Sequence, residues 1–101
     1  MTEVIERVIL DKPRANITPE ELATANEVGQ TLLLAIPGVE AVSFGIALSA
    51  DEPYQWYVRI RFRDEQALET FNTHPNHLNF AEQYWGPLLA DHSVRDYRLQ
   101  Y

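Results

Sequence analysis

The sequence predicts an α+β fold in which helices cover one face of a four-stranded, mainly antiparallel sheet. Four stretches carry strand patterning, three helix signals lie between them, and their order is β-α-β-β-α-α-β. That order is the ferredoxin-like arrangement. A chain of 101 residues is large enough for one core, so residues 1–101 are expected to form a single domain.

The first half of the chain supplies a strand, a helix and a second strand. Residues 4–10 are β-branched and predict the first strand, and residues 11–16 are interpreted as a loop. Thr18-Pro19-Glu20-Glu21 predicts a helix start, because it combines a cap, a proline at the first helical position and a capping-box carboxylate. The helix ends at Pro37-Gly38. Gly29 within it indicates close helix–sheet packing or, as the alternative, room for a ligand.

The second half supplies two strands and two helices. Residues 39–48 predict a second strand that is apolar on both faces, and residues 54–63 alternate regularly between apolar and polar side chains. Asp64 is expected to cap the next helix. Residues 94–101 predict the last strand, with His92 in the turn before it.

Two helices are expected to meet at a bend within Phe71-Asn72-Thr73-His74-Pro75-Asn76-His77-Leu78-Asn79-Phe80. Pro75 disfavours helical geometry at His74 and pre-sets the first turn of a new helix. Helical spacing then predicts that one face of this helix points at the sheet and carries His77, Phe80, Ala81, Tyr84 and Leu88. Gly86-Pro87 is expected to interrupt it.

Composition excludes several classes of function. A net charge of -7 argues against a nucleic-acid partner, which needs a basic surface. The absence of cysteine excludes disulfides and thiolate chemistry. No apolar run is long enough to span a bilayer and the N-terminus lacks a targeting pattern, so a cytoplasmic location is expected. No phosphate loop or Ser-His-Asp order is found, and no cofactor is expected.

The pattern of the sheet predicts a homodimer. Helices can cover only one side, yet the first two strands are apolar on both sides, which leaves a surface that needs a partner. A second copy packed sheet against sheet would cover it. Arg59, Arg61 and Arg63 point to that side; they face the partner subunit with acidic partners, lie on a solvated edge, or bind an anion.

Several motifs together resemble the stress-responsive A/B barrel family, also described as dimeric α+β barrel (Dabb) domains. They are Ile36-Pro37-Gly38-Val39, the strand from Tyr54 to Phe62, the run from Phe71 to His77, and Asp96-Tyr97. The resemblance extends from Val4 to Tyr97. It implies a ferredoxin-like subunit and a dimer whose two sheets close into a barrel. Many members have no assigned activity, and some are linked to stress tolerance in plants.

A few plant members of that family are polyketide cyclases, in which the second histidine of His-Pro-x-His is the acid/base. The resemblance places that role on His77. The other polar groups of those enzymes do not carry over: the tyrosine before the motif is Phe71, the histidine of the third strand falls on Trp56, and the tyrosine of the first helix falls near Gly29. Proton transfer there would lack its oriented partners, which argues against cyclase activity.

The candidate site residues follow from these patterns. His77 is proposed as a general acid or base with Tyr84 or Tyr54, the alternative being a histidine hydrogen-bonded at the lip of the core. A ligand-binding pocket, or simply core, is expected from Trp56, Phe71, His74, Phe80 and Tyr54, and the aromatic residues Tyr84 and Trp85 belong to the same candidate set. No metal site is expected, because His74 and His77 straddle a proline without a third ligand nearby.

Three functions are compatible with these residues. The first is a homodimer, of unassigned activity, that binds a small apolar or aromatic molecule between sheet and helices. The second is a cofactor-independent enzyme, polyketide-cyclase-like or monooxygenase-like, that uses His77. The third is an assembly protein whose dimers build larger oligomers.

Overall fold

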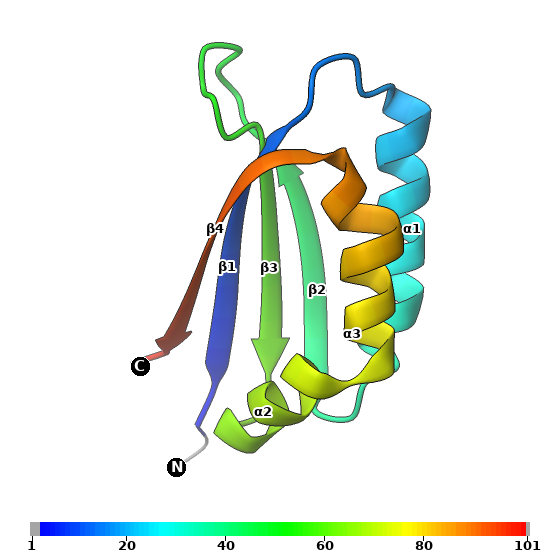
Figure 1. The fold of residues 1–101 in the computed structure, drawn as a ribbon. Coiled ribbons are helices and arrows are strands. Elements are labelled where there is room, and N and C mark those ends of the chain that lie inside the picture. The colour runs from blue at the N-terminus through cyan, green and yellow to red at the C-terminus, as the bar shows by residue number, and fades with distance from the viewer. Residues whose placement is uncertain (1–2, 101) are drawn as a thin grey trace.

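One antiparallel sheet organises the computed structural model, which describes residues 3–100. Its strands lie in the order β2-β3-β1-β4, and every neighbouring pair is antiparallel (Figure 1). The elements are β1 (Ile5–Pro13), α1 (Pro19–Leu34), β2 (Val39–Ile46), β3 (Trp56–Phe62), α2 (Glu65–Thr73), α3 (Pro75–Asn79), the π-helical segment η1 (Phe80–Trp85), the 3-10 turn η2 (Gly86–Leu88) and β4 (Leu89–Arg98). The predicted fold class and element order are confirmed.

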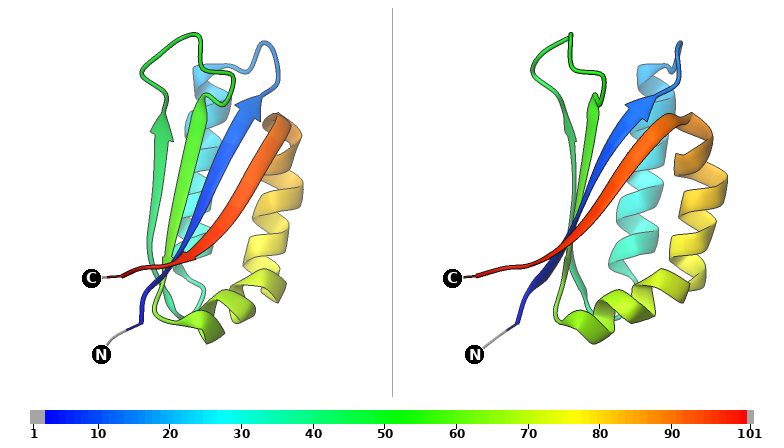
Figure 2. Two further views of the ribbon diagram at one scale, coloured as in Figure 1. Left: turned by 90° about the vertical axis from the view of Figure 1, so that its left-hand side faces the viewer. Right: turned by 60° about the vertical axis from the view of Figure 1, so that its left-hand side comes forward.

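The helices lie on one face of the sheet and leave the other face open (Figure 2). On β3 the alternation is strict: Trp56, Val58, Ile60 and Phe62 are at most 7% exposed and face the helices. The intervening side chains face away. We call this second side the open face; its members on the four strands are Glu6, Val8, Leu10, Ala41, Ser43, Gly45, Tyr57, Arg59, Arg61, Ser93, Arg95 and Tyr97.

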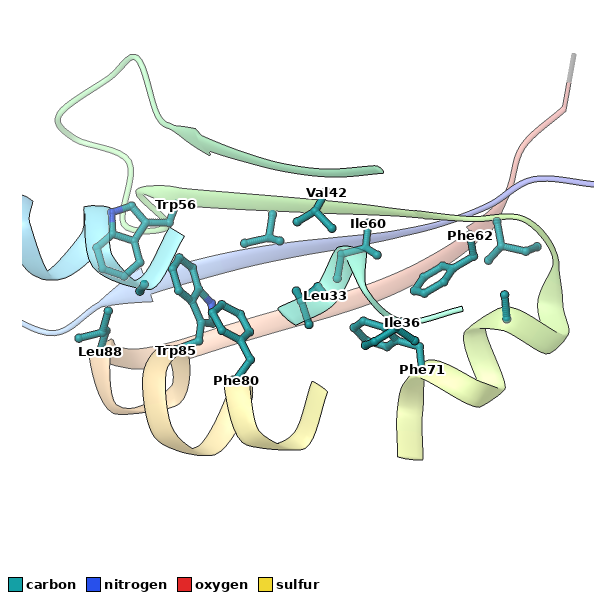
Figure 3. Packing of buried hydrophobic residues seen from close by; sticks show 14 residues of the cluster. Leu33, Ile36, Val42, Trp56, Ile60, Phe62, Phe71, Phe80, Trp85 and Leu88 are labelled. Carbon is teal, nitrogen blue, oxygen red and sulfur yellow. The ribbon is translucent and has the colours of Figure 1, made fainter. Parts of the chain in front are cut away.

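Aromatic rings fill both ends of the core (Figure 3). Phe62 and Phe71 meet edge to face at 5.1 Å at one end. At the other end Trp85 packs between Trp56, at 5.2 Å, and Phe80, at 5.7 Å. Such pairs stabilise a core beyond the burial of their surface. Among residues 3–100 no helix is both long and apolar enough to cross a membrane.

Local side-chain bonds start the helices as the sequence indicates. Thr18 Oγ1 accepts from the Glu21 N–H at 3.1 Å, and Glu21 Oε1 accepts from the Thr18 N–H at 3.1 Å, which completes the capping box. Asp64 caps α2 through the Ala67 N–H at 2.9 Å. His74 caps α3, because its Nδ1 accepts from the Asn76 N–H at 3.0 Å.

Gly29 lies where α1 approaches two aromatic rings. A Cβ placed there would come within 2.8 Å of Phe44 Cζ and 2.9 Å of Phe80 Cζ. Only glycine lets the helix come this close, so the packing interpretation of Gly29 is confirmed and the space over it is filled by aromatic rings.

Strands β1 and β4 are longer than the sequence predicted. β1 continues through residues expected in a loop, because Asp11 pairs with Trp56 on one side and with His92 on the other. The last strand begins at Leu89 and not at Val94, so His92 lies within β4 and not in a turn. The fourth strand was predicted to continue to Tyr101; it ends at Arg98, before Leu99 and Gln100, and Tyr101 itself lies outside the described residues.

The prediction that Tyr84 faces the sheet is wrong. Tyr84 is 39% exposed, whereas its neighbour Trp85 is only 6% exposed. An α-helix would return residue 84 to the face of His77, seven residues earlier. The wider i→i+5 turns of η1 delay that return by about one residue and bring Trp85 inward instead.

Candidate functional site

A cavity of about 470 Å³ lies between the inward faces of β1 and β4 and the helical segment α3–η1. We call it the sheet–helix cavity. Its lining consists of Arg7, Ile9, Asp11, His77, Ala81, Trp85, Gly86, Leu89, Ala90, Asp91, His92 and Val94. A mainly apolar lining with a few converging polar groups is typical of small-molecule sites.

The inward face of β1 supplies charge as well as apolar surface. Along it Ile5 and Ile9 alternate with Arg7 and Asp11. Arg7 is bound by Asp96 of β4 through two hydrogen bonds, Nε to Oδ1 at 2.8 Å and an Nη to Oδ2 at 3.1 Å. This bidentate pairing compensates the guanidinium charge.

Asp11 is the only charged side chain among the described residues that is fully buried, with 0% exposure. Its Oδ2 accepts from Trp85 Nε1 at 3.0 Å, whereas its Oδ1 is buried without a hydrogen-bond partner among residues 3–100. Burial raises the pKa of Asp11 from 3.8 to about 6, although the Trp85 bond and the charge of His92 act against the rise. The carboxyl therefore changes charge near neutral pH.

His77 stacks on the Phe71 ring at a centroid distance of 4.2 Å. Its Nδ1 is buried and has no hydrogen-bond partner within the described chain. Burial lowers the pKa of His77 below that of an exposed histidine, the backbone of Asn72 opposes this, and the charge of Arg7 adds to it. The imidazole is therefore neutral at pH 7, the form that can accept a proton.

Tyr54, in the loop before β3, contacts one residue of the cavity lining. Its hydroxyl donates to Asp91 Oδ2 at 2.6 Å, and Asp91 is part of the lining. This bond holds the pKa of Asp91 below its usual range and raises that of Tyr54. Tyr54 is thus connected to the cavity that holds His77, through one carboxylate.

The structure does not bring the other proposed site residues into the lining of this cavity. Phe71 and Phe80 are core residues, and His74 is a helix cap. Trp56 lines a separate hollow of about 280 Å³ beside Phe44, so it does not fill the space next to His77. Tyr84 lies in hollows against α1, beside Thr24.

Sequence reasoning missed Arg7 and Asp11. The available signal was a charge at every second inward position of an otherwise apolar strand, which is expensive in a core unless the charges are paired or used. Trp85 was named from the sequence only as one of the aromatic residues that form a pocket or core. Its contact with Asp11 was not predictable, because it depends on the π-helical geometry of η1, which turns the indole inward.

The arrangement suits proton transfer and hydrogen bonding to a small molecule. A neutral imidazole and a buried carboxyl whose pKa is about 6 share one mainly apolar space. Titratable groups whose pKa values are shifted by burial in a cavity, as for Asp11 upward and His77 downward, are typical of acid–base sites. No group of three or more His, Cys, Asp or Glu side chains that could hold a metal ion occurs in residues 3–100.

Comparison with known proteins agrees with this fold. Residues 5–99 match the model of the stress responsive A/B barrel domain. A dimeric ferredoxin-like protein of unknown function from Thermobifida fusca is 23% identical, with a TM-score of 0.84 over 98% of this chain and 93% of that one. A Dabb family protein with a ferredoxin-like fold from Mesorhizobium loti is 22% identical, with a TM-score of 0.81 over 94% and 95%.

A hydroxynitrile lyase from Passiflora edulis has the same fold at 13% identity, with a TM-score of 0.86 over 99% of this chain and 96% of that one. Further solved structures of this fold are described as dimeric proteins of unknown function. A search of curated proteins finds no match. The relatives thus include both an enzyme and dimers without assigned activity.

Proposed function

This chain belongs to the stress responsive A/B barrel (Dabb) family, and within that family we propose that it binds a small, mainly apolar molecule in the sheet–helix cavity. The observation that carries the proposal is the cavity itself, which measures about 470 Å³ and is walled by Ile9, Ala81 and Val94. Two buried polar atoms of its lining residues, Asp11 Oδ1 and His77 Nδ1, have no hydrogen-bond partner in the described part of the chain. Such a space accommodates a ring system and offers it a few hydrogen bonds.

The test fills the cavity. Ala81→Phe places a ring in the space, while Glu82→Phe places the same ring on an exposed neighbour that is outside the lining. A fluorescence titration with the neutral probe N-phenyl-1-naphthylamine measures the affinity. We expect Ala81→Phe to bind the probe at least about tenfold more weakly, or about 1.4 kcal/mol, than Glu82→Phe or the unmodified chain. Equal affinities in all three would refute the site.

A second candidate is a cofactor-independent enzyme that uses His77 as general base, whether polyketide-cyclase-like, monooxygenase-like or, like the Passiflora edulis protein, a lyase. The specific support is the half-buried, neutral imidazole in the cavity lining, whose Nδ1 has no hydrogen-bond partner among residues 3–100. Tyr84 is exposed and faces away, so Tyr54 with Asp91 is the better-placed helper.

Ring opening of 5-nitrobenzisoxazole tests for a positioned base, because it needs only removal of one carbon-bound proton as the N–O bond breaks. The unmodified chain should open the ring faster than buffer alone does. His77→Ala should abolish this acceleration, and Tyr84→Phe should retain it. The rate should rise with pH as His77 loses its proton. Because the pKa of His77 is lowered, the rate should reach its plateau by about pH 7. A His77→Ala protein that retains the rate would contradict the assignment.

We also propose that the chain is a homodimer that pairs through the open face. Relatives are described as dimeric. Leu10, Tyr57 and Tyr97 on this face are 41%, 37% and 53% exposed, an apolar surface of the kind that subunit contacts cover. Arg59 lies 3.8 Å from Glu6 and Arg61 lies 3.9 Å from Glu40, so these arginines have acidic neighbours within the subunit.

A further inference from the structure

We propose that Asp11 selects the ligand of the sheet–helix cavity, and that its Oδ1 accepts a hydrogen bond from the hydroxyl group of a neutral, mainly apolar molecule. This inference rests on the proposed function, because it names the chemical class that the cavity takes.

The hydrogen bonding of Asp11 supports the role. Oδ2 is occupied by Trp85 Nε1 at 3.0 Å, which fixes the plane of the carboxyl group. Oδ1 has no hydrogen-bond partner among the residues that the structure describes, although the whole side chain is buried, and Asp11 belongs to the wall of the cavity. An unpaired buried acceptor is costly, and a ligand hydroxyl would relieve that cost.

The charges around Asp11 disfavour an anionic ligand. Arg7 is an arginine of the cavity lining, but Asp96 already holds it in a bidentate pair. His77 is neutral at pH 7, and a ligand carboxylate would lie beside the Asp11 carboxylate, where like charges repel. The titratable or charged groups that surround Asp11 are His92 and Asp91 of β4, Arg7 and Lys12 of β1, and His77 of α3.

The cavity therefore favours a neutral hydroxyl compound over its ether or carboxylate analogue. Phenol and anisole are a matched pair of probes: they share a ring, and only phenol donates a hydrogen bond. The Trp85 indole N–H bonds to the same carboxyl group, so its NMR resonance reports on binding at Asp11. The chain has two tryptophans, and the indole resonance that disappears in Trp85→Phe is the one from Trp85 and not from Trp56.

We expect phenol to bind about tenfold more tightly than anisole at about pH 7.5, as a hydrogen bond to a charged group implies. Asp11→Asn should remove most of this preference. The amide oxygen must serve Trp85 Nε1, which leaves an N–H donor where Oδ1 was. Glu82→Gln makes the same change on an exposed residue outside the cavity and should keep the preference. Lowering the pH to about 5, below the pKa of Asp11, should weaken it in the unmodified chain.

Two results overturn the inference alone: equal affinity for phenol and anisole in the unmodified chain, or an undiminished preference in Asp11→Asn. In both cases the proposed function stands if Ala81→Phe still blocks the cavity. Failure of phenol and anisole to shift the Trp85 resonance, with N-phenyl-1-naphthylamine also unbound, overturns both proposals.

Discussion

Trp85 Nε1 donates a hydrogen bond to Asp11 Oδ2 at 3.0 Å, and this contact ties the π-helical segment to the first strand across 74 positions of sequence. It explains how a carboxyl group is kept fully buried in the core. It also depends on η1, because an uninterrupted α-helix would present Tyr84 to the sheet in place of Trp85.

Asp11→Asn should make the free energy of unfolding less dependent on pH. The pKa of Asp11 is raised from 3.8 to about 6 in the folded chain, so the folded state binds the proton more tightly than the unfolded state. The stability from this proton is fully present below 3.8 and is lost as the pH rises through about 6. At neutral pH the buried carboxylate should therefore cost about 2–3 kcal/mol.

Urea unfolding from about pH 4 to about pH 7.5 measures this effect. The stability of Asp11→Asn relative to the unmodified chain should rise by about 2–3 kcal/mol over that range. Asp51→Asn makes the same change in an exposed loop and should show no comparable trend. A stability difference for Asp11→Asn that is constant with pH would contradict the raised pKa.

Gly29→Ala should destabilise the fold by about 1 kcal/mol. Helix propensity alone would stabilise it by about 1 kcal/mol, but the new Cβ would lie 2.8 Å from Phe44 Cζ, and such overpacking costs about 1–3 kcal/mol. Thermal or urea unfolding gives the value. Ala23→Gly, at an exposed position of α1, calibrates the propensity term. If Gly29→Ala stabilises the chain by the full propensity amount, the close approach to Phe44 is not present.

Leu10→Asp should weaken dimerisation by at least about tenfold, because it places a charge in an apolar contact between sheets. The neighbouring Ile9 and Val42 point to the helices, so charges there would test the core and not the interface. Leu48→Asp is the control, since Leu48 is fully exposed in a loop. Sedimentation at micromolar concentration measures the mass. A monomeric unmodified chain, or an undisturbed Leu10→Asp dimer, would count against the open face as the interface.

Much of the fold was predictable because its signals are local. The capping box at Thr18, the alternation along β3 and the proline bend after His74 each depend on residues a few positions apart. The strand ends were less predictable. Asp11 and His92 extend their strands because they pair with each other across β1 and β4, and no local pattern records that pairing.

Part of the candidate site was likewise predictable from local motifs. His77 and Tyr54 were named from the sequence, and the structure connects both to one cavity. Tyr84 was expected beside them, and the wider turns of η1 turn it outward. For Phe71 and Phe80 the sequence left a pocket lining or a core position open, and the structure places both in the core.

The order of residues is enough to predict the α+β class, the order of the elements, the family and the position of His77 at a helix start. Which side chains meet in the cavity follows instead from the packed fold, because it depends on strand register and on the phase of a helix. Asp11 reaches Trp85 through both: β1 turns its carboxyl group inward, and the π-helical segment brings the indole to it. Strand register and helix phase both depend on packing between distant segments. No periodic pattern in the sequence reports that packing.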